Sequence, residues 1–477
     1  MIRLLLALLL SLAMPRGSDA QTAGDAPSSW SGTVELPGGT KLDFVVELNK
    51  DSGTISIPMQ GAKDLPLSGV VVTATELKFA IEAAGAAWEM KVAADGKTAE
   101  GVLKQGGEFK TTMKRLVAGE APKKSLNRPQ EPKPPFAYES IEAYFENKAA
   151  GVTLAGTLTL PKGNGPFPCV VMVTGSGPQN RDEELLGHKP FLVIADQLTR
   201  HGVAVLRYDD RGIGKSTGKF TEATSDDFAA DALAGVEYLK SRKEISAKNI
   251  GIIGHSEGGI IAPMCASQSK DVAFIVLLAG TGISGAELLP IQSKLINIAD
   301  GMTSDDAQVQ CQEEAAMLKL ITTGRSQADV TKAIREAVIR QLRLDPETKG
   351  LSEEKLNERA TQVATEQYTE LSSPWFRRFL TLDPRDYLKK VTCPVLAING
   401  EKDRQVPPKQ NLPEIDKALK AGGNEDVTTV ELPNLNHLFQ NCKTGSPSEY
   451  ADIEETFTPA ALELVTTWIR KHSGFER

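Results

Sequence analysis

The chain has 477 residues, of which 40% are hydrophobic and 24% are charged. This length suffices for two or three domains, and this balance is typical of a folded globular protein. The formal net charge is −8 and no long basic run interrupts the sequence, which argues against nucleic acid as a partner.

The first 20 residues have the pattern of a secretory signal peptide. Arg3 precedes an apolar run at residues 4–10, and Ser18 and Ala20 place small side chains before a cleavage site after Ala20. The apolar run is too short to span a bilayer. We therefore expect an exported protein, periplasmic or secreted, without stable membrane insertion. A retained N-terminal anchor is the alternative.

Residues 21–117 are predicted to form a small all-β domain, either a barrel or a sandwich. Short runs of alternating apolar and polar residues are separated by turn residues, and they lie at 32–36, 42–48, 53–57, 70–73, 77–81 and 87–92. The segment contains no His and no Cys. We expect it to serve as a scaffold, as a substrate-binding element or as a contact between copies of the chain. The third role would make the protein a homo-oligomer.

Residues 118–137 are rich in Pro and Lys, which predicts a semi-rigid linker. From residue 138 to 477, strand-like and helix-like runs alternate. Strands are expected at 153–160, 169–173, 204–208, 250–254, 274–278, 395–398 and 428–432, and helices at 191–200, 226–240, 258–267, 412–421 and 459–471. This alternation predicts an α/β domain with a doubly wound, mostly parallel sheet.

One insertion interrupts the alternation at about residues 286–380. It is charged, rich in helix-forming residues and nearly free of Pro. We expect a helical cap over the carboxyl ends of the strands, because open α/β sheets bind their ligands at that edge.

The segment Gly254-His255-Ser256-Glu257-Gly258 lies between a strand-like run and a helix-like run. This is the context of a G-x-S-x-G nucleophile elbow, in which a sharp turn presents the serine at a helix N-terminus. An ordinary glycine-rich turn is the alternative. The flanking strand and helix favour Ser256 as a catalytic nucleophile.

A serine hydroxyl needs an adjacent base, which a third group orients. When the nucleophile comes first in the chain, the acid follows and the histidine comes last. Asp403, in the polar turn after the strand at 395–398, is the expected acid, with Glu401 as its rival. His437, in the loop after the last strand, is the expected base, with His188 as its rival.

An oxyanion hole needs two backbone N–H donors. We expect one from Glu257, the residue after the nucleophile, and the other from Ser176 in the loop at residues 174–178. Gly177 is the second choice for that donor and an expected substrate contact. The glycine-bearing loop at 207–216 lacks the spacing of a phosphate loop, and Arg–Asp pairs are expected to brace it.

Three motifs, at residues 175–183, 209–216 and 373–377, make residues 139–471 resemble the α/β-hydrolase superfamily. The closer resemblance is to exported bacterial carboxylesterases, which are grouped with serine aminopeptidase-like hydrolases. It implies a Ser-Asp-His triad, no cofactor, hydrolysis of short-acyl esters and a β-domain before the catalytic one. Glu257 departs from the pattern, because many relatives carry Leu, Met or Gln there, and it leaves the substrate class open.

The expected function is that of an exported serine hydrolase that cleaves small-molecule carboxylic esters through an acyl-enzyme. A serine peptidase of aminopeptidase type, which would need an acidic site in the cap, is the alternative, and a non-catalytic binding protein is a third reading. Trp375 and Phe376 are expected either to line an acyl pocket or to pack inside the cap. No spacing resembles a metal site. Cys393 and Cys442 are candidates for a disulfide, with at least one of the five cysteines left free.

Overall fold

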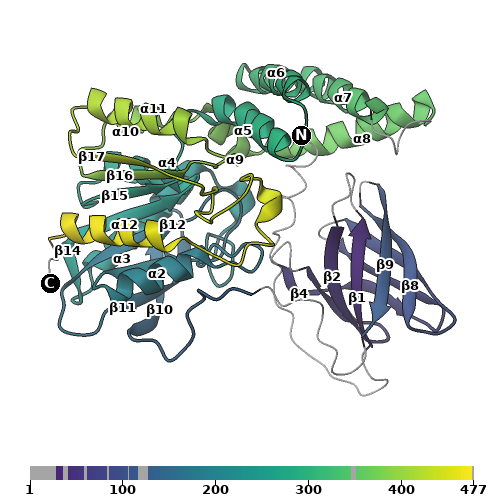
Figure 1. Ribbon diagram of the computed structural model, residues 1–477, viewed down its shortest axis with the longest axis horizontal. Coiled ribbons are helices and arrows are strands. Elements are labelled where there is room, and N and C mark those ends of the chain that lie inside the picture. Colours follow the sequence, from purple (N-terminus) through teal and green to yellow (C-terminus); the bar gives the residue numbers. More distant parts are fainter. Residues whose placement is uncertain are drawn as a thin grey trace. The chain divides into compact units, whose positions relative to one another are not determined.

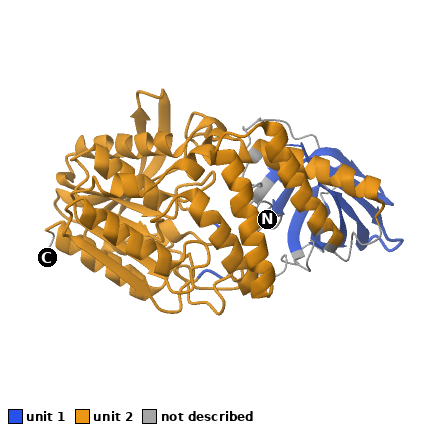
Figure 2. Ribbon diagram, turned by 90° about the horizontal axis from the view of Figure 1, so that it is seen from above, with its two compact units in different colours: residues 1–128, 185–187 blue, residues 129–184, 188–477 orange. Residues whose placement is uncertain are grey.

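The computed structural model describes residues 28–35, 41–57, 62–82, 85–105, 107–116, 127–344 and 351–474 (Figure 1). The chain forms two compact units, residues 1–128 with 185–187 and residues 129–184 with 188–477 (Figure 2). The expected signal peptide and the first half of the expected linker lie outside the described residues. No helix in the described ranges has both the length and the apolar character needed to cross a bilayer.

Unit 1 is a single antiparallel sheet with the strand order β4-β3-β2-β1-β9-β8-β7-β6-β5. Alternate residues face one core, in which Trp88 lies 5.6 Å from Phe44 and 5.2 Å from Phe79 between ring centroids. The predicted all-β domain is therefore confirmed. Its strands are β1 Ser28–Glu35, β2 Lys41–Leu48, β3 Gly53–Ile57, β4 Ala62–Pro66, β5 Ser68–Val72, β6 Glu76–Ile81, β7 Ala86–Val92, β8 Thr98–Lys104 and β9 Glu108–Arg115.

Unit 2 contains a sheet with the order β10-β11-β13-β12-β14-β15-β16-β17. The pairs β10–β11 and β11–β13 are antiparallel, and every pair from β13 to β17 is parallel. The predicted mostly parallel sheet is confirmed. Its strands are β10 Glu139–Asn147, β11 Val152–Leu160, β12 Phe167–Val173, β13 Ala204–Tyr208, β14 Ile245–His255, β15 Ile275–Leu278, β16 Val395–Gly400 and β17 Val427–Leu432.

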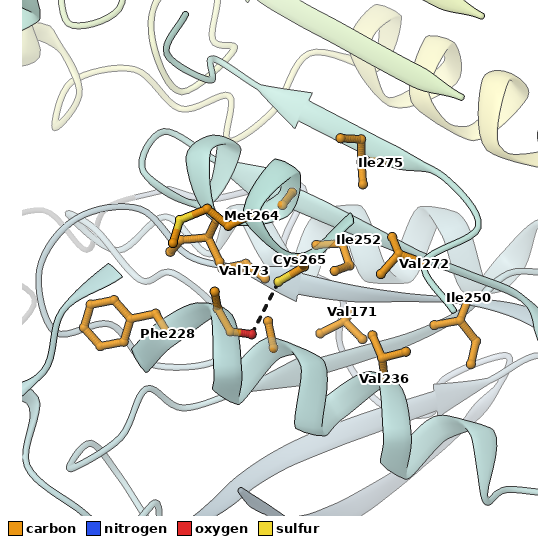
Figure 3. Close-up of a cluster of buried hydrophobic side chains, with 14 of the residues drawn as sticks. Val171, Val173, Phe228, Val236, Ile250, Ile252, Met264, Cys265, Val272 and Ile275 are labelled. Atoms are coloured by element: carbon orange, nitrogen blue, oxygen red, sulfur yellow. Dashed lines mark hydrogen bonds between the residues drawn. The ribbon is translucent and has the colours of Figure 1, made fainter. Parts of the chain in front are cut away.

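Helices cover both faces of this sheet, as a doubly wound fold requires. Successive side chains of a strand point to opposite faces, so Val171 packs with α3, α4, α10 and α11, whereas Val170 packs with α2 and α12. Cys265 of α4 lies against α3, with its thiol 3.4 Å from the carbonyl oxygen of Ala229 (Figure 3). These helices are α2 Pro190–Arg200, η3 Phe220–Glu222, α3 Ser225–Lys240, α4 Gly258–Gln268, α10 Arg385–Leu388, α11 Pro408–Ala421, η4 Pro447–Glu449 and α12 Pro459–His472.

The predicted helical cap is confirmed between β15 and β16. It consists of α5 Gly285–Ala299, α6 Ser304–Thr322, α7 Gln327–Leu344, α8 Glu353–Leu371 and α9 Pro374–Thr381. Ser284 and Ser373 cap the first and the last of these helices by accepting backbone N–H groups at their N-termini. Arg378 of α9 forms an ion pair with Asp226 of α3. This ion pair connects the cap to a helix that covers the sheet.

Part of the expected linker is fastened to unit 2. The Gln130 side chain accepts the N–H groups of Thr456, at 2.6 Å, and Phe457, at 3.1 Å, and it donates to the Phe457 carbonyl at 2.7 Å. Residues 129–137 therefore belong to unit 2. The candidate disulfide between Cys393 and Cys442 is absent, because all five cysteines are free thiols.

We expect a variant chain that begins at Asn127 to be more stable than one that begins at Pro135. The shorter chain loses the three hydrogen bonds of Gln130, each worth about 1 kcal/mol. Thermal melting of the two chains should show a difference of a few degrees. Gln130→Ala in the full chain is the matched control and should lower the melting temperature of this unit similarly. Equal melting of the two truncated chains would contradict the expectation.

Candidate active site

The turn between β14 and α4 presents Ser256. Its φ angle is +52°, in the left-handed region that non-glycine residues rarely occupy and that nucleophile elbows require. From Ile250 to Cys265, Ser256 is the only residue that is not buried. The surrounding structure therefore holds the serine on a strained turn and leaves its hydroxyl accessible.

Glycines close this turn because no side chain fits. A Cβ atom on Gly254 would lie 1.9 Å from the carbonyl oxygen of Gly258, and one on Gly258 would lie 2.2 Å from that of Val173. The N–H of Ser256 donates to the Leu278 carbonyl at 2.9 Å. The turn is thus packed on the ends of two neighbouring strands.

Asp403 is completely buried in the loop after β16. Its Oδ1 accepts the N–H groups of Gln405 at 2.8 Å and Val406 at 2.7 Å, and its Oδ2 lies 2.8 Å from Nδ1 of His437. These three contacts fix the orientation of the carboxylate. Because a carboxylate oxygen accepts, the contact with His437 is a hydrogen bond when Nδ1 carries the proton, which leaves Nε2 as the nitrogen that could act as a base.

The rival residues have other partners. Glu401 accepts the N–H of Asn434 at 2.9 Å. His188 is fully buried, with Nδ1 2.9 Å from the Thr456 hydroxyl and Nε2 3.0 Å from the Tyr450 carbonyl oxygen. These contacts favour Asp403 and His437 for the two roles.

The base loop lies against the elbow. His255, the neighbour of Ser256, has its ring centroid 4.7 Å from that of His437, and its Nε2 is 3.1 Å from the His437 carbonyl oxygen. Ser256, Asp403 and His437 follow β14, β16 and β17, whose carboxyl ends meet at one edge because the strands are parallel. The structure thus brings the three expected residues to one place.

The loop after β12 passes beside the nucleophile. A Cβ atom on Gly175 would lie 3.2 Å from Cβ of Ser256. The Gly175 N–H donates to Oε1 of Glu183 at 2.7 Å, so Ser176 is the next backbone donor along the loop. Gly177 is buried, has a φ of +91°, and has open space where a side chain would start.

The carboxylate of Glu257 is buried at 2% exposure and has two side-chain donors. Ser225 donates at 2.6 Å, and the Trp375 indole donates at 3.0 and 3.1 Å. Burial raises the pKa of Glu257, although Ser225, Trp375 and the nearby Ser176 side chain lower it. The carboxylate of the residue after Ser256 is therefore paired within the protein.

Trp375 packs inside the cap and also reaches the elbow. Its ring stacks on Phe379 at 5.6 Å and 19° and lies 5.9 Å from Phe376, which is cap packing. Its hydrogen bond to Glu257 joins it to the residue after Ser256. Phe376 is 8% exposed and has its ring contact with Trp375.

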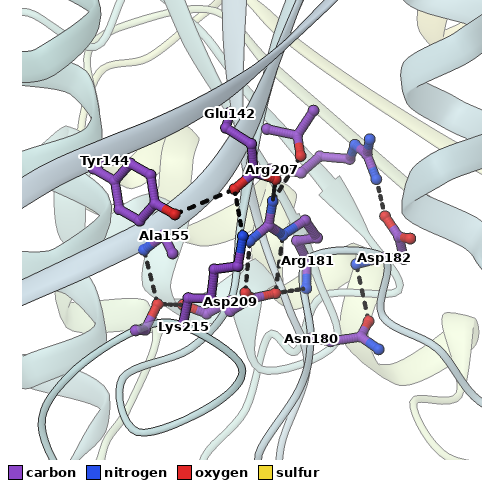
Figure 4. A network of polar contacts seen from close by, with 11 residues as sticks. Glu142, Tyr144, Ala155, Asn180, Arg181, Asp182, Arg207, Asp209 and Lys215 are labelled. Atoms are coloured by element: carbon purple, nitrogen blue, oxygen red, sulfur yellow. Dashed lines mark hydrogen bonds and ion pairs between the residues drawn. The ribbon is translucent and has the colours of Figure 1, made fainter.

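Arg–Asp pairs brace the loop at 207–216, and they also hold the loop after β12 (Figure 4). Arg181 donates to both carboxylate oxygens of Asp209, at 3.1 and 2.7 Å, and Arg207 pairs with Asp182. A bidentate Arg–carboxylate pair fixes orientation as well as distance. These contacts stabilise the segment that carries the expected oxyanion donor.

The sequence analysis did not identify Glu183 and Ser225 as neighbours of the site. Glu183 could have been found, because it ends the motif at residues 175–183. Ser225 could not, because a serine at the start of a helix is common and does not indicate a site. Among the residues that the structure describes, no group of three or more His, Cys, Asp or Glu side chains is arranged to hold a metal ion.

Known proteins resemble part of this chain. Esterase EstD of Thermotoga maritima is 29% identical over 316 residues, which are 66% of this chain and 65% of the esterase. Acyl-coenzyme A thioesterase 1 of Homo sapiens is 31% identical over 128 residues, 26% of this chain and 27% of that protein. This chain thus spans less than two thirds of either relative. The solved α/β hydrolase GrgF from Penicillium sp. has 18% identity and a TM-score of 0.43, covering 71% of this chain and 99% of that one.

The family model described as X-Pro dipeptidyl-peptidase (S15 family) matches residues 150–431, which is more than half of the chain. The matched range begins just before β11 and ends in β17, so it includes the elbow, the cap and Asp403. The chain belongs to the S15 family, within the α/β-hydrolase superfamily.

Proposed function

We propose that this protein is a serine hydrolase that cleaves carboxylic esters of small molecules, with short acyl groups preferred. The observation that carries the proposal is the position of Ser256 on a left-handed turn, at the same sheet edge as the bonded pair of Asp403 and His437. The 29% identity to a protein named as an esterase supports the ester substrate.

Each residue has a defined role in the proposed reaction. His437 Nε2 takes the proton of Ser256 as the hydroxyl attacks the ester carbonyl, and Asp403 stabilises the imidazolium that forms. The N–H groups of Ser176 and Glu257 stabilise the negative charge on the carbonyl oxygen. The alcohol then leaves with the proton from His437, and water, activated by the same nitrogen, hydrolyses the acyl-enzyme.

A peptidase is the second candidate, because the description of the S15 family names an X-Pro dipeptidyl-peptidase. A peptidase that recognises a free amino terminus needs a carboxylate available to the substrate ammonium group. Glu257 directly follows Ser256, but its oxygens already accept hydrogen bonds from Ser225 and Trp375. This occupancy favours the ester substrate.

The substrate class is tested by a panel of p-nitrophenyl esters of graded acyl length, assayed beside aminoacyl and Xaa-Pro nitroanilides. The proposal requires higher kcat/KM for the short esters than for every anilide. Higher kcat/KM for an Xaa-Pro anilide would establish the peptidase instead. Failure to react with a fluorophosphonate probe would show a non-catalytic binding protein, since only an activated serine is labelled.

We also propose that the protein is exported, on the basis of the signal-peptide pattern in residues 1–20 alone.

We expect Ser256→Ala and His437→Ala each to lower kcat on p-nitrophenyl acetate by about 10⁴-fold or more. Asp403→Asn should cost somewhat less, because the base remains although its tautomer is no longer controlled. His201→Gln, at an exposed helix end, is the matched histidine control and should leave kcat unchanged. Near-normal activity of His437→Ala, together with its loss in His188→Ala, would show that the base is wrongly assigned.

We expect Trp375→Ala to shift the preferred acyl length, because the Trp375 indole is hydrogen-bonded to Glu257 at the edge of the proposed oxyanion hole. The measurement is kcat/KM across the graded esters, with the melting temperature recorded for each variant. Arg377→Ala, two residues along the same helix and exposed, serves as the control. An unaltered preference with stability reduced by several kcal/mol would mean that Trp375 acts only in cap packing.

A further inference from the structure

His255 occupies a buried position between the nucleophile and the base loop. It is 7% exposed. Its Nδ1 lies 2.9 Å from Oε1 of Glu183, and its Nε2 lies 3.1 Å from the carbonyl oxygen of His437. The mechanism proposed above uses neither the imidazole of His255 nor the carboxylate of Glu183.

These two contacts determine the protonation state of the ring. A neutral imidazole carries one N–H donor and one lone pair, whereas the imidazolium carries two donors. The His437 carbonyl oxygen can only accept, and Glu183 Oε1 already acts as an acceptor for the N–H of Gly175 at 2.7 Å. Both contacts of His255 are hydrogen bonds only when both of its nitrogens are protonated.

The charges around the ring agree with this geometry. Burial works against the charged ring, but the charge and the hydrogen bond of Glu183, the His437 carbonyl and the charge of Asp403 outweigh it and raise the pKa of His255. The other titratable groups that face the pair are the His437 ring, at 4.7 Å, and Asp210, whose carboxyl interacts with Glu183. Because the pKa is raised, the ring keeps its second proton to a higher pH than an ordinary histidine and loses it as the pH rises through the raised value.

The ion pair connects three separate segments of the site. Glu183 holds the start of the oxyanion loop through the Gly175 N–H, His255 belongs to the elbow, and the His437 carbonyl belongs to the base loop. Glu183 itself has a left-handed φ of +50°, a conformation that persists only where surrounding contacts enforce it. Catalytic groups must keep their relative positions within a fraction of an ångström, because a displacement of about 1 Å can cost about 100-fold in rate.

We propose that Glu183 and the protonated His255 are positioning residues that hold the oxyanion loop and the base loop in register with Ser256. This inference rests on the proposed serine hydrolase function. Neither side chain takes part in the chemistry, and both act through the backbones of Gly175 and His437. Their loss should therefore reduce kcat more than it changes KM.

Glu183→Gln is the main test, since it keeps the size of the side chain and one acceptor oxygen but removes the charge. Without that charge, burial dominates and the pKa of His255 falls, so the ring becomes neutral in the working range and loses one of its two bonds. For p-nitrophenyl acetate we expect kcat to fall about 10- to 100-fold with KM within about two-fold. The kcat–pH profile of the variant should gain a descending limb that the wild type lacks, as His255 loses its proton.

His255→Gln tests whether the charge of His255 causes the change in the pH profile. A glutamine amide is neutral at every pH, so kcat should fall by a similar factor without the new limb. The double variant should lose little more than either single one, because residues that act as a unit are not additive. His472→Gln is the matched control, since His472 forms another histidine–carboxylate contact, 3.4 Å from Asp426, at the amino end of β17. Its pH profile should follow the wild type.

The outcomes distinguish this inference from the proposed function. A wild type that does not react with the fluorophosphonate probe overturns the proposed function. A reactive wild type, with unchanged kcat and a wild-type pH profile in both Glu183→Gln and His255→Gln, overturns the positioning role alone. If either variant does not fold, ¹⁵N-histidine spectra of the intact His472→Gln protein, recorded as the pH is raised, decide. One ring should keep both nitrogens protonated to a higher pH than an ordinary histidine does, and the absence of such a ring overturns the inference.

Discussion

Ser256 can keep its left-handed backbone conformation only because the backbones on both sides of it are in contact. Gly254 approaches Gly258, and Gly258 approaches Val173, at distances that leave no room for a Cβ atom. The same contacts bring the loop after β12 beside the serine. The position of the expected oxyanion donor therefore depends on the closeness of the turn. A larger residue at either glycine would move the nucleophile and the loop together.

Buried carboxylates determine how the other loops meet this turn. Asp403, Glu183 and Glu257 are each 5% exposed or less, and each accepts hydrogen bonds from donors on more than one segment. An unpaired charge at such depth would cost several kcal/mol, so each carboxylate restricts the positions of the segments that supply its donors. The base loop, the oxyanion loop and the cap helix are thus held in place by the need to satisfy buried charge, in addition to apolar packing.

The parts of this fold that were predictable from the sequence are those in which burial leaves a local pattern. Strands of the parallel sheet that are covered on both faces are mostly apolar, and β12, β13 and β16 were all expected close to their observed bounds. Strand β10 was missed because it lies at the sheet edge and carries glutamates beside the buried Ala143 and Phe145. Strands β8 and β9 lie inside their sheet and were missed because their outward faces are charged or polar.

Long-range pairing, by contrast, leaves no local pattern. Glu183 and His255 are 72 residues apart, and Trp375 and Glu257 are 118 apart, so only the folded chain brings them together. Glu257 was noted in the sequence as an unusual residue after the nucleophile, and its partners explain how it is tolerated. They also have a physical consequence for the cap. Helix α9 cannot move away from the elbow without withdrawing the Trp375 N–H from a buried carboxylate. That carboxylate belongs to the residue after Ser256, so in the proposed mechanism the position of the cap and the stabilisation of the oxyanion depend on the same residue.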